Sequence, residues 1–172
     1  NAAGELVASP TEPDDIYAAV WDGTPWGAPG LVPVHYGLQI AFDAYDAAHA
    51  AVVYVRDLDG DPGSTGDQEL YGTTWNGSAW SSPARLTHND LGDHSPALVY
   101  TAADTIQLLC RRGDSLYYSD GVLAEPLYPV LLGVPTALVD YQAAVDPDGN
   151  LVLVWQEAAP GGVDAYSAVY DG

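Results

Sequence analysis

A seven-residue phrase, Tyr-x-x-x-aromatic-[Asp/Asn]-Gly, returns along this chain. It occurs at Tyr17–Gly23, Tyr71–Gly77 and Tyr166–Gly172, and a copy two residues shorter occurs at Tyr117–Gly121. The successive closing glycines are 54, 44 and 51 residues apart. A period of roughly 50 residues, made only of short strand-like pieces, is typical of a β-propeller with one four-stranded blade per repeat. We therefore predict an all-β chain that forms a β-propeller or part of one.

The same order of strands fits every repeat. The second repeat has predicted strands at Leu38–Ala44, Ala51–Arg56, Glu69–Trp75 and Ala79–Leu86, and the third at Ser95–Thr101, Ile106–Arg111, Ser115–Ser119 and Val122–Leu127. The first repeat starts at its second strand, with Glu5–Ser9, Ile16–Trp21 and Trp26–Val34; the last has only Ala137–Val145, Leu151–Gln156 and Ala165–Tyr170. We predict one domain of about three repeat equivalents, with blades 35–87 and 88–132 between incomplete blades 1–34 and 133–172.

Hairpin turns mark the end of the third strand in these repeats. Asn76-Gly77 is the strongest of them, because both central residues of a type I′ turn need positive φ. Asp22-Gly23 and Asp171-Gly172 repeat this chemistry. Trp75 and Trp80 flank the Asn76-Gly77 turn. In the same way, Trp21 and Trp26 flank the Asp22-Gly23 turn. We expect each tryptophan pair to pack beside its hairpin rather than to stack on a ligand.

The incomplete blades predict assembly. An unfinished blade leaves unpaired backbone groups on its edge, and propellers have at least about four blades. Three repeat equivalents are too few for a closed ring. We therefore expect further copies of the chain, or other protein chains, to supply the missing strands.

The strong negative charge of the chain limits which kinds of molecule it can bind. The sequence has 24 acidic residues and 4 basic ones, all arginine, which gives a formal net charge of −20 over 172 residues. Such a surface repels nucleic acid and anionic lipid, and it favours divalent cations. Cys110 is the single cysteine, so no internal disulfide forms. We find no signal peptide and no membrane-spanning stretch, so membrane insertion is not expected.

The loop between the second and third strands of the second repeat is a candidate Ca²⁺ site. Its acids alternate along the chain, at Asp57, Asp59, Asp61 and Asp67, with Gly60, Gly63 and Gly66 between them. Alternate carboxylates can surround a hard cation, and the glycines let the chain wrap around it. The spacing is not that of an EF-hand. The alternative is a solvated acidic loop without an ion.

Three other polar patterns have structural readings that we favour. His88, Asp90, Asp93 and His94 lie close in sequence, but their spacing matches no tight zinc pattern, so polar rim residues are the favoured reading. Arg112-Gly113-Asp114 is the tripeptide that adhesion receptors recognise, although Gly-Asp is also ordinary turn chemistry. Glu69 and Asp164 precede the third strand of their repeats, as Glu12, Asp14 and Asp15 do in the first. We expect these acids to hydrogen-bond nearby backbone amides.

Signals for catalysis are few. The sequence has no Gly-x-Ser-x-Gly elbow, P-loop or dinucleotide-binding glycine pattern. Carboxylates are plentiful, so a glycoside-acting enzyme stays open as the least favoured alternative. We predict a protein that is not an enzyme.

The repeat also resembles a known group of proteins. Asp67–Leu86 carries the phrase Asp-x-x-Leu-Tyr-x-x-x-Trp-Asn-Gly-x-x-Trp-x-x-Pro-x-x-Leu, and Asp14–Leu31 carries part of it. With Pro96–Tyr100 and Asp146–Asn150, it resembles the blades of large secreted or cell-surface β-propeller proteins of bacteria and archaea. The resemblance implies an extracellular or cell-surface module for protein contact or structural assembly.

Two further relatives bear on the function. The Asp-box of sialidases does not fit, because Asp22 and Asn76 directly precede glycine. Small fucose-binding propeller lectins carry a similar Trp-Asp-Gly-x-x-Trp phrase, but their sites pair Arg and Glu in each blade, and this chain has four Arg, unevenly placed. We therefore predict a non-enzymatic, Ca²⁺-stabilised assembly module, with a glycan-binding lectin as the alternative.

Overall fold

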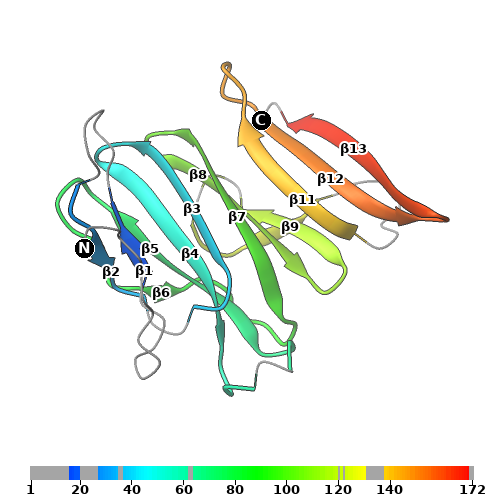
Figure 1. The fold of residues 1–172 in the computed structure, drawn as a ribbon, viewed down its shortest axis with the longest axis horizontal. Coiled ribbons are helices and arrows are strands. Elements are labelled where there is room, and N and C mark those ends of the chain that lie inside the picture. The colour runs from blue at the N-terminus through cyan, green and yellow to red at the C-terminus, as the bar shows by residue number, and fades with distance from the viewer. Residues whose placement is uncertain are drawn as a thin grey trace, which may run out of the picture.

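The described residues form strands and no helix. The computed structural model describes residues 16–19, 27–34, 37–61, 64–119, 121, 123–130 and 138–170. Four antiparallel sheets, each built from strands consecutive in sequence, lie in chain order across Figure 1. The all-β prediction is therefore confirmed. The four sheets do not close into a barrel or a ring within the described part of the chain.

Each sheet is an antiparallel meander. The first sheet is β1 (Ile16–Ala18) and β2 (Gly30–Val32). The second is β3 (Ile40–Asp46), β4 (His49–Asp57), β5 (Gln68–Trp75) and β6 (Ala84–Arg85). The third is β7 (Asp93–Ala102), β8 (Thr105–Arg112), β9 (Ser115–Ser119) and β10 (Leu127–Pro129). The fourth has three strands, β11 (Leu138–Val145), β12 (Leu151–Ala159) and β13 (Gly162–Tyr170).

The predicted strands match this order, and the largest differences are in the fourth strand of each repeat. In place of Ala79–Leu86 the structure has only β6, with an isolated bridge between Trp75 and Trp80. In place of Val122–Leu127 it has β10, which begins at Leu127. Prolines at 83 and 126 explain the late starts, because proline has no amide to donate to the ladder. The predicted strand Glu5–Ser9, with Trp21, Trp26 and the turns at Asp22 and Asp171, lies outside the described residues.

Hydrophobic clusters join each sheet to the next. One cluster packs Val32 on β2, and Val34 just after that strand, against Val52 and Tyr54 on β4. A second lies between the second and third sheets, and it includes Val53, Leu70, Tyr100 and Leu108. A third lies between the third and fourth sheets, and it includes Val99, Leu109, Leu153 and Trp155. Adjacent residues of one strand thus serve two different cores, since side chains alternate between faces.

The central strands show why the sheets stack. Five consecutive apolar residues, Ala51–Val55 on β4, are all buried, and so are Ile106–Cys110 on β8, of which only Gln107 is polar. A strand covered on both faces reads as a continuous apolar run rather than an alternating one. β13 differs, because all nine of its residues are exposed. On its neighbour β12, buried Leu151, Leu153 and Trp155 alternate with less buried residues, so this strand has one covered face.

Aspartates close two equivalent turns between first and second strands. Asp46 accepts hydrogen bonds from the amides of Ala48 and His49, and Asp146 accepts them from those of Asp148 and Asn150. These bonds, chiefly that from Ala48 for Asp46 and that from the Asn150 side chain for Asp146, lower the pKa of both carboxyls. The turns stay capped as ionised Asx turns at neutral pH.

Candidate metal site and interaction surfaces

The loop between β4 and β5 gathers three of the four predicted ligands. Carboxylate oxygens of Asp57, Asp59 and Asp67 all lie within 4.8 Å of one another. Asp61 is not part of this cluster; its amide instead donates to Asp59 Oδ1 at 2.7 Å. The cluster therefore has three carboxylates, not the four that the sequence spacing predicted.

Backbone hydrogen bonds hold these carboxylates toward one another. The Asp59 amide donates to Asp67 Oδ2 at 2.9 Å, and the Gly60 amide donates to Asp57 Oδ1 at 2.8 Å. Partial desolvation acts to raise the pKa of Asp67, but hydrogen bonds from the Ser64 hydroxyl and the Asp59 amide outweigh it and lower the pKa. The lowered pKa favours the charged form of Asp67, and an anionic carboxylate close to two further carboxylates favours a cation between them.

The second carboxylate oxygen of Asp57, Oδ2, differs from the other oxygens of this cluster in its surroundings. This oxygen is buried and has no hydrogen-bond partner among the described residues. A buried carboxylate oxygen without a donor is costly. A hard cation bound by carboxylate oxygens would satisfy it, and Ca²⁺ takes such ligands. The three carboxylates therefore form a group that could hold a metal ion.

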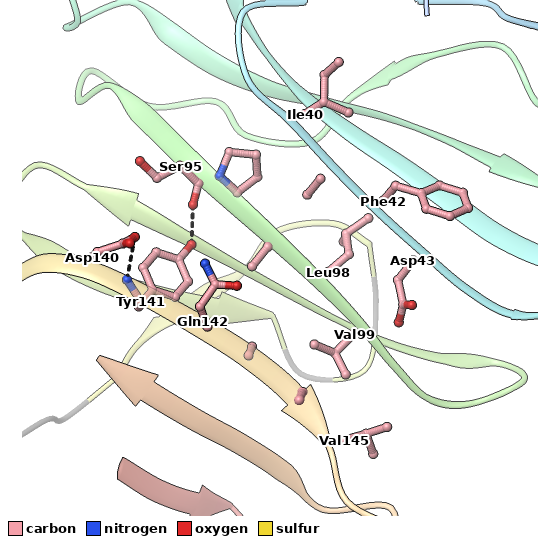
Figure 2. A pocket seen from close by; sticks show the side chains of 15 residues that line it. Ile40, Phe42, Asp43, Ser95, Leu98, Val99, Asp140, Tyr141, Gln142 and Val145 are labelled. Carbon is pink, nitrogen blue, oxygen red and sulfur yellow. Dashed lines mark hydrogen bonds between the residues drawn. The ribbon is translucent and has the colours of Figure 1, made fainter. Parts of the chain in front are cut away.

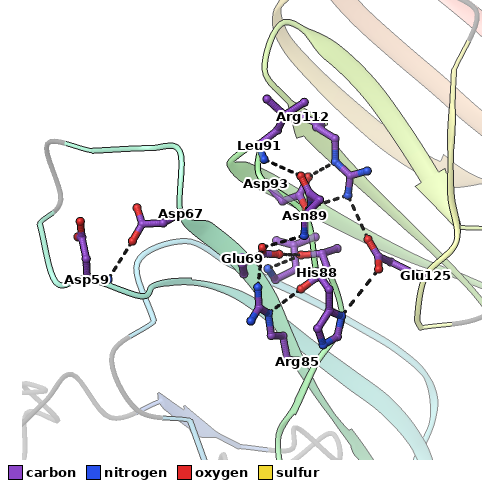
Figure 3. Close-up of polar contacts among 12 residues, drawn as sticks. Asp59, Asp67, Glu69, Arg85, His88, Asn89, Leu91, Asp93, Arg112 and Glu125 are labelled. Carbon is purple, nitrogen blue, oxygen red and sulfur yellow. Dashed lines mark hydrogen bonds and ion pairs between the residues drawn. The ribbon is translucent and has the colours of Figure 1, made fainter.

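The acidic loop packs against the loop between β6 and β7. A Cβ added at Gly92 would lie 1.6 Å from the Thr65 carbonyl oxygen, so only glycine allows this approach. The β4–β5 loop and the β6–β7 loop therefore lie against each other on one side of the second sheet. Figure 3 shows the acidic loop beside a second polar group on that face.

Glu69 and Arg85 begin this second group. The Glu69 side chain is 1% exposed and accepts hydrogen bonds from Arg85 at 2.7 Å and from the Thr87 hydroxyl at 2.5 Å. It also accepts one from the Asn89 amide at 3.2 Å. Only one of these bonds comes from a backbone amide, and all three partners lie 16 to 20 residues further along the chain, so Glu69 joins strands and loops rather than bonding to nearby amides as predicted. Asn89 then donates to Asp93 Oδ2 at 2.7 Å, which extends the group to the third sheet.

Asp93 and Arg112 form the core of the group. Asp93 is 0% exposed and binds Arg112 in a bidentate pair at 2.7 and 2.9 Å. These hydrogen bonds raise the pKa of Arg112. Arg112 also contacts Glu125 at 3.4 Å, and His88 lies 3.7 Å from that same carboxylate. The group is a structural ion-pair network that ties the second sheet to the third (Figure 3).

The contacts in this network test two sequence patterns, the possible metal ligands between His88 and His94 and the adhesion-type tripeptide that begins at Arg112. His88, Asp90, Asp93 and His94 do not form a metal-binding cluster among the described residues, because Asp93 binds Arg112 and His94 Nδ1 lies 3.1 Å from Ser95 Oγ. Arg112, the first residue of the adhesion-type tripeptide, is held in the ion pair and its side chain is 14% exposed. An adhesion receptor would need that guanidinium free, so we set this reading aside.

A groove of about 630 Å³ runs across β3, β7 and β11, the first strands of their sheets (Figure 2). Its two carboxylates bind backbone amides: Asp43 accepts from Tyr100, and Asp140 accepts from Tyr141. Ser95 has a positive φ of 52°, and hydrogen bonds to the sheets on both sides hold it in place. Its amide donates to Gln39 and its carbonyl accepts from the Tyr141 hydroxyl. The bonds of Asp43 and Ser95 join neighbouring sheets, whereas that of Asp140 lies within β11.

The fourth sheet presents an uncharged surface, here named the outer face. By register and alternation, the residues of this face point away from the buried Leu151, Leu153 and Trp155. They are Gln142, Ala144, Val152, Val154, Gln156, Ala158, Val163, Ala165, Ser167 and Val169. Val154, Val163 and Val169 are 46%, 51% and 62% exposed. Within 138–170, only Asp140 at its margin, opposite Gln156, brings a charge into register with this face.

Comparison with protein-family models, curated proteins and solved structures finds no match. In the described ranges the chain has no helix that could span a membrane.

Sequence reasoning missed the Asp93–Arg112 pair and the outer face. Asp93 and Arg112 are 19 residues apart, and their pairing depends on the β7–β8 register, which joins these two residues directly. A sequence signal existed for the outer face: every second position on β12 and β13 carries Val, Ala, Gln or Ser, and none of these positions carries a charged residue. Without the partner of each strand, however, alternation does not tell which face is covered.

Proposed function

We propose that this chain is a non-enzymatic β-propeller-type module that works outside the cell through contact with other protein chains, in the first place further copies of itself. The blade-like repeat and the stacking of successive four-stranded meanders support the propeller part of the proposal. The absence of Lys and the strongly acidic composition suit an extracellular setting.

The observation that carries the proposal is the outer face of the fourth sheet. The equivalent faces of the second and third sheets are covered by the next sheet in the chain. On a chain with 24 acidic residues, an exposed face with three valines and only one charge at its margin is unusual. Such a patch marks a contact site. At the other end of the stack, Tyr17 and Leu31 are paired and exposed, which offers an apolar surface for head-to-tail contact.

The proposal is tested by measuring the mass of the assembly that the chain forms in solution. We expect sedimentation equilibrium to show association that strengthens as NaCl rises, because salt screens the repulsion between two chains of −20. Val154→Glu should reduce the association constant at least tenfold, since it buries a charge in the contact. Leu91→Glu is the matched control, because Leu91 is 57% exposed but lies in the β6–β7 loop. A monomer at every salt and protein concentration would contradict the proposal.

We also propose that Ca²⁺ binds between Asp57, Asp59 and Asp67 and stiffens the β4–β5 loop. The support is the close carboxylate set and the buried, unbonded Asp57 Oδ2. Bound Ca²⁺ would neutralise part of the local charge and fix the loop against Gly92.

We expect Ca²⁺ at a hundred times its Kd to raise Tm by roughly 5–10 °C, and EGTA to reverse the rise. Asp67→Asn should abolish most of this shift, because it removes one of three clustered carboxylates. Asp61→Asn should keep most of it, and Asp114→Asn, at a fully solvated turn, should keep all of it. Equal shifts for the Asp67 and Asp61 variants would show that the ion sits elsewhere, and an unchanged wild-type Tm in Ca²⁺ would show that none binds.

A further inference from the structure

Ser95 joins three sheets at one point. It lies on β7 of the third sheet, and its amide donates a hydrogen bond to the Gln39 side chain, just before β3 of the second sheet. Its carbonyl accepts a hydrogen bond from the hydroxyl of Tyr141, on β11 of the fourth sheet (Figure 2). A φ of 52° is uncommon for a residue with a Cβ, so these bonds hold a backbone conformation that a free chain rarely adopts. A change at Ser95 therefore reaches all three sheets.

His94 lies next to this joint. Its Nδ1 is 3.1 Å from the Ser95 hydroxyl oxygen, and its side chain is partly buried. In the β7–β8 register His94 is paired with Arg111, and paired residues lie on the same face of a sheet. Leu109, two residues before Arg111 on β8, packs into the core between the third and fourth sheets. By strand alternation, His94 and Arg111 therefore face the fourth sheet.

Arg111 disfavours a second positive charge at this joint. Its side chain is 19% exposed, and its Nε is buried with no hydrogen-bond partner among the described residues. It contacts Asp114 at 4.0 Å, but the Asp114 side chain is 97% exposed, so the pair compensates the charge weakly. A proton added to His94 would place two cations side by side where water is partly excluded, and such an arrangement is costly.

The nearby carboxylates do not reverse this effect. Burial lowers the pKa of His94, and the positive charge of Arg111 lowers it further. Asp93, which precedes His94 on β7, and Asp114 act to raise this pKa, but the net direction is downward. The Asp93 carboxylate is already bound by Arg112. His94 is therefore held in its neutral form at neutral pH.

The neighbouring sheets bring uncharged groups to the joint. The second sheet contributes the amide of Gln39. The fourth sheet contributes the hydroxyl of Tyr141, and burial raises the pKa of this hydroxyl, so it stays protonated. Asp140, the residue before Tyr141, accepts a hydrogen bond from the Tyr141 amide at 2.8 Å. Neither sheet places a carboxylate among the groups that shift the pKa of His94.

We propose that His94 is an acid-sensitive switch between the third and fourth sheets, which supports the Ser95 joint while neutral and opens it when protonated. The switch does not depend on the proposed function. Because the folded chain lowers the pKa of His94 below its ordinary value of about 6.5, the open form binds more protons as the pH falls below that value. The stabilisation from neutral His94 is complete above the ordinary value and is lost as the pH falls through the folded pKa.

The test compares hydrogen exchange of the intact chain at about pH 7.5 and about pH 5.5, corrected for intrinsic exchange rates. We expect acid to increase the opening of β11–β13 about two- to fivefold more in the wild type than in His94→Gln, whose amide does not titrate. The difference between the two chains removes the effect of pH on the other acidic and basic groups, which they share. His88→Gln is the matched control, because His88 is 60% exposed and contacts Glu125; it should respond as the wild type does.

Two further measurements locate the effect. NMR titration of the histidine rings should place the midpoint of His94 below that of a histidine in the unfolded chain. Arg111→Leu should raise this midpoint and reduce the acid response, because the neighbouring cation is lost. A midpoint at or above the unfolded value, equal acid responses of the wild type and His94→Gln, or acid opening of β3–β6 in place of β11–β13 would overturn the inference.

Discussion

Replacing Arg112 by methionine is expected to lower the free energy of unfolding by about 3–5 kcal/mol. The reason is Asp93, which is 0% exposed and would be left as a buried charge without its bidentate partner. Arg112 also lies 5.0 Å from the Tyr117 ring centroid and 3.4 Å from Glu125, so its loss affects three neighbours at once. Chemical denaturation at neutral pH gives the measurement.

The double variant Arg112→Met/Asp93→Asn separates charge from packing. It should recover a large part of the loss, since the uncompensated carboxylate is gone while the amide can still accept from Asn89. Asp114→Ala is the control within the same turn: its side chain is 97% exposed, and the change should stay within about 0.5 kcal/mol. If Arg112→Met costs no more than Asp114→Ala, the pair does not stabilise the joint between the second and third sheets.

The repeat predicted the strands well because their signals are local. Asn76-Gly77 marked one hairpin, and the apolar run Ala51–Val55 and the largely apolar run Ile106–Cys110 marked strands with two covered faces. The fourth strands were predicted less well. Their pairing in β6 and β10 is short and begins only after a proline. Before it, Trp80 makes one isolated bridge to Trp75, and both Trp80 and Leu123 pack against hydrophobic cores. Propensity within a window does not report that kind of contact.

The candidate metal site was predicted in part for the same reason. Alternation along the sequence selected Asp57, Asp59, Asp61 and Asp67 equally. Which carboxylates converge is set by the turn at Gly60, which has φ of 78°, and by hydrogen bonds between Asp59 and Asp67. The ion pair of Asp93 with Arg112 was beyond sequence reasoning altogether, because strand register alone brings the two together. Local patterns thus predict elements, while register predicts sites.

Truncation of Leu108 is expected to have the other large effect. Leu108 is 0% exposed in the core between the second and third sheets, and Leu108→Ala should cost about 2–5 kcal/mol. For a chain of 172 residues this corresponds to a fall in Tm of about 4–20 °C. Its neighbour Leu109 is 1% exposed, but it faces the core between the third and fourth sheets. Leu109→Ala removes the same atoms from the opposite face of one strand.

This pair of variants tests whether the stack unfolds as one unit. If neighbouring sheets are coupled through β8, both variants should lower a single unfolding transition by similar amounts, with Leu91→Ala as the exposed control. If the fourth sheet opens alone, Leu109→Ala should speed hydrogen exchange only in β11–β13 and leave the main transition in place. That second outcome would mean that the outer sheet, with its exposed edge and face, gains its full stability only when a partner covers it.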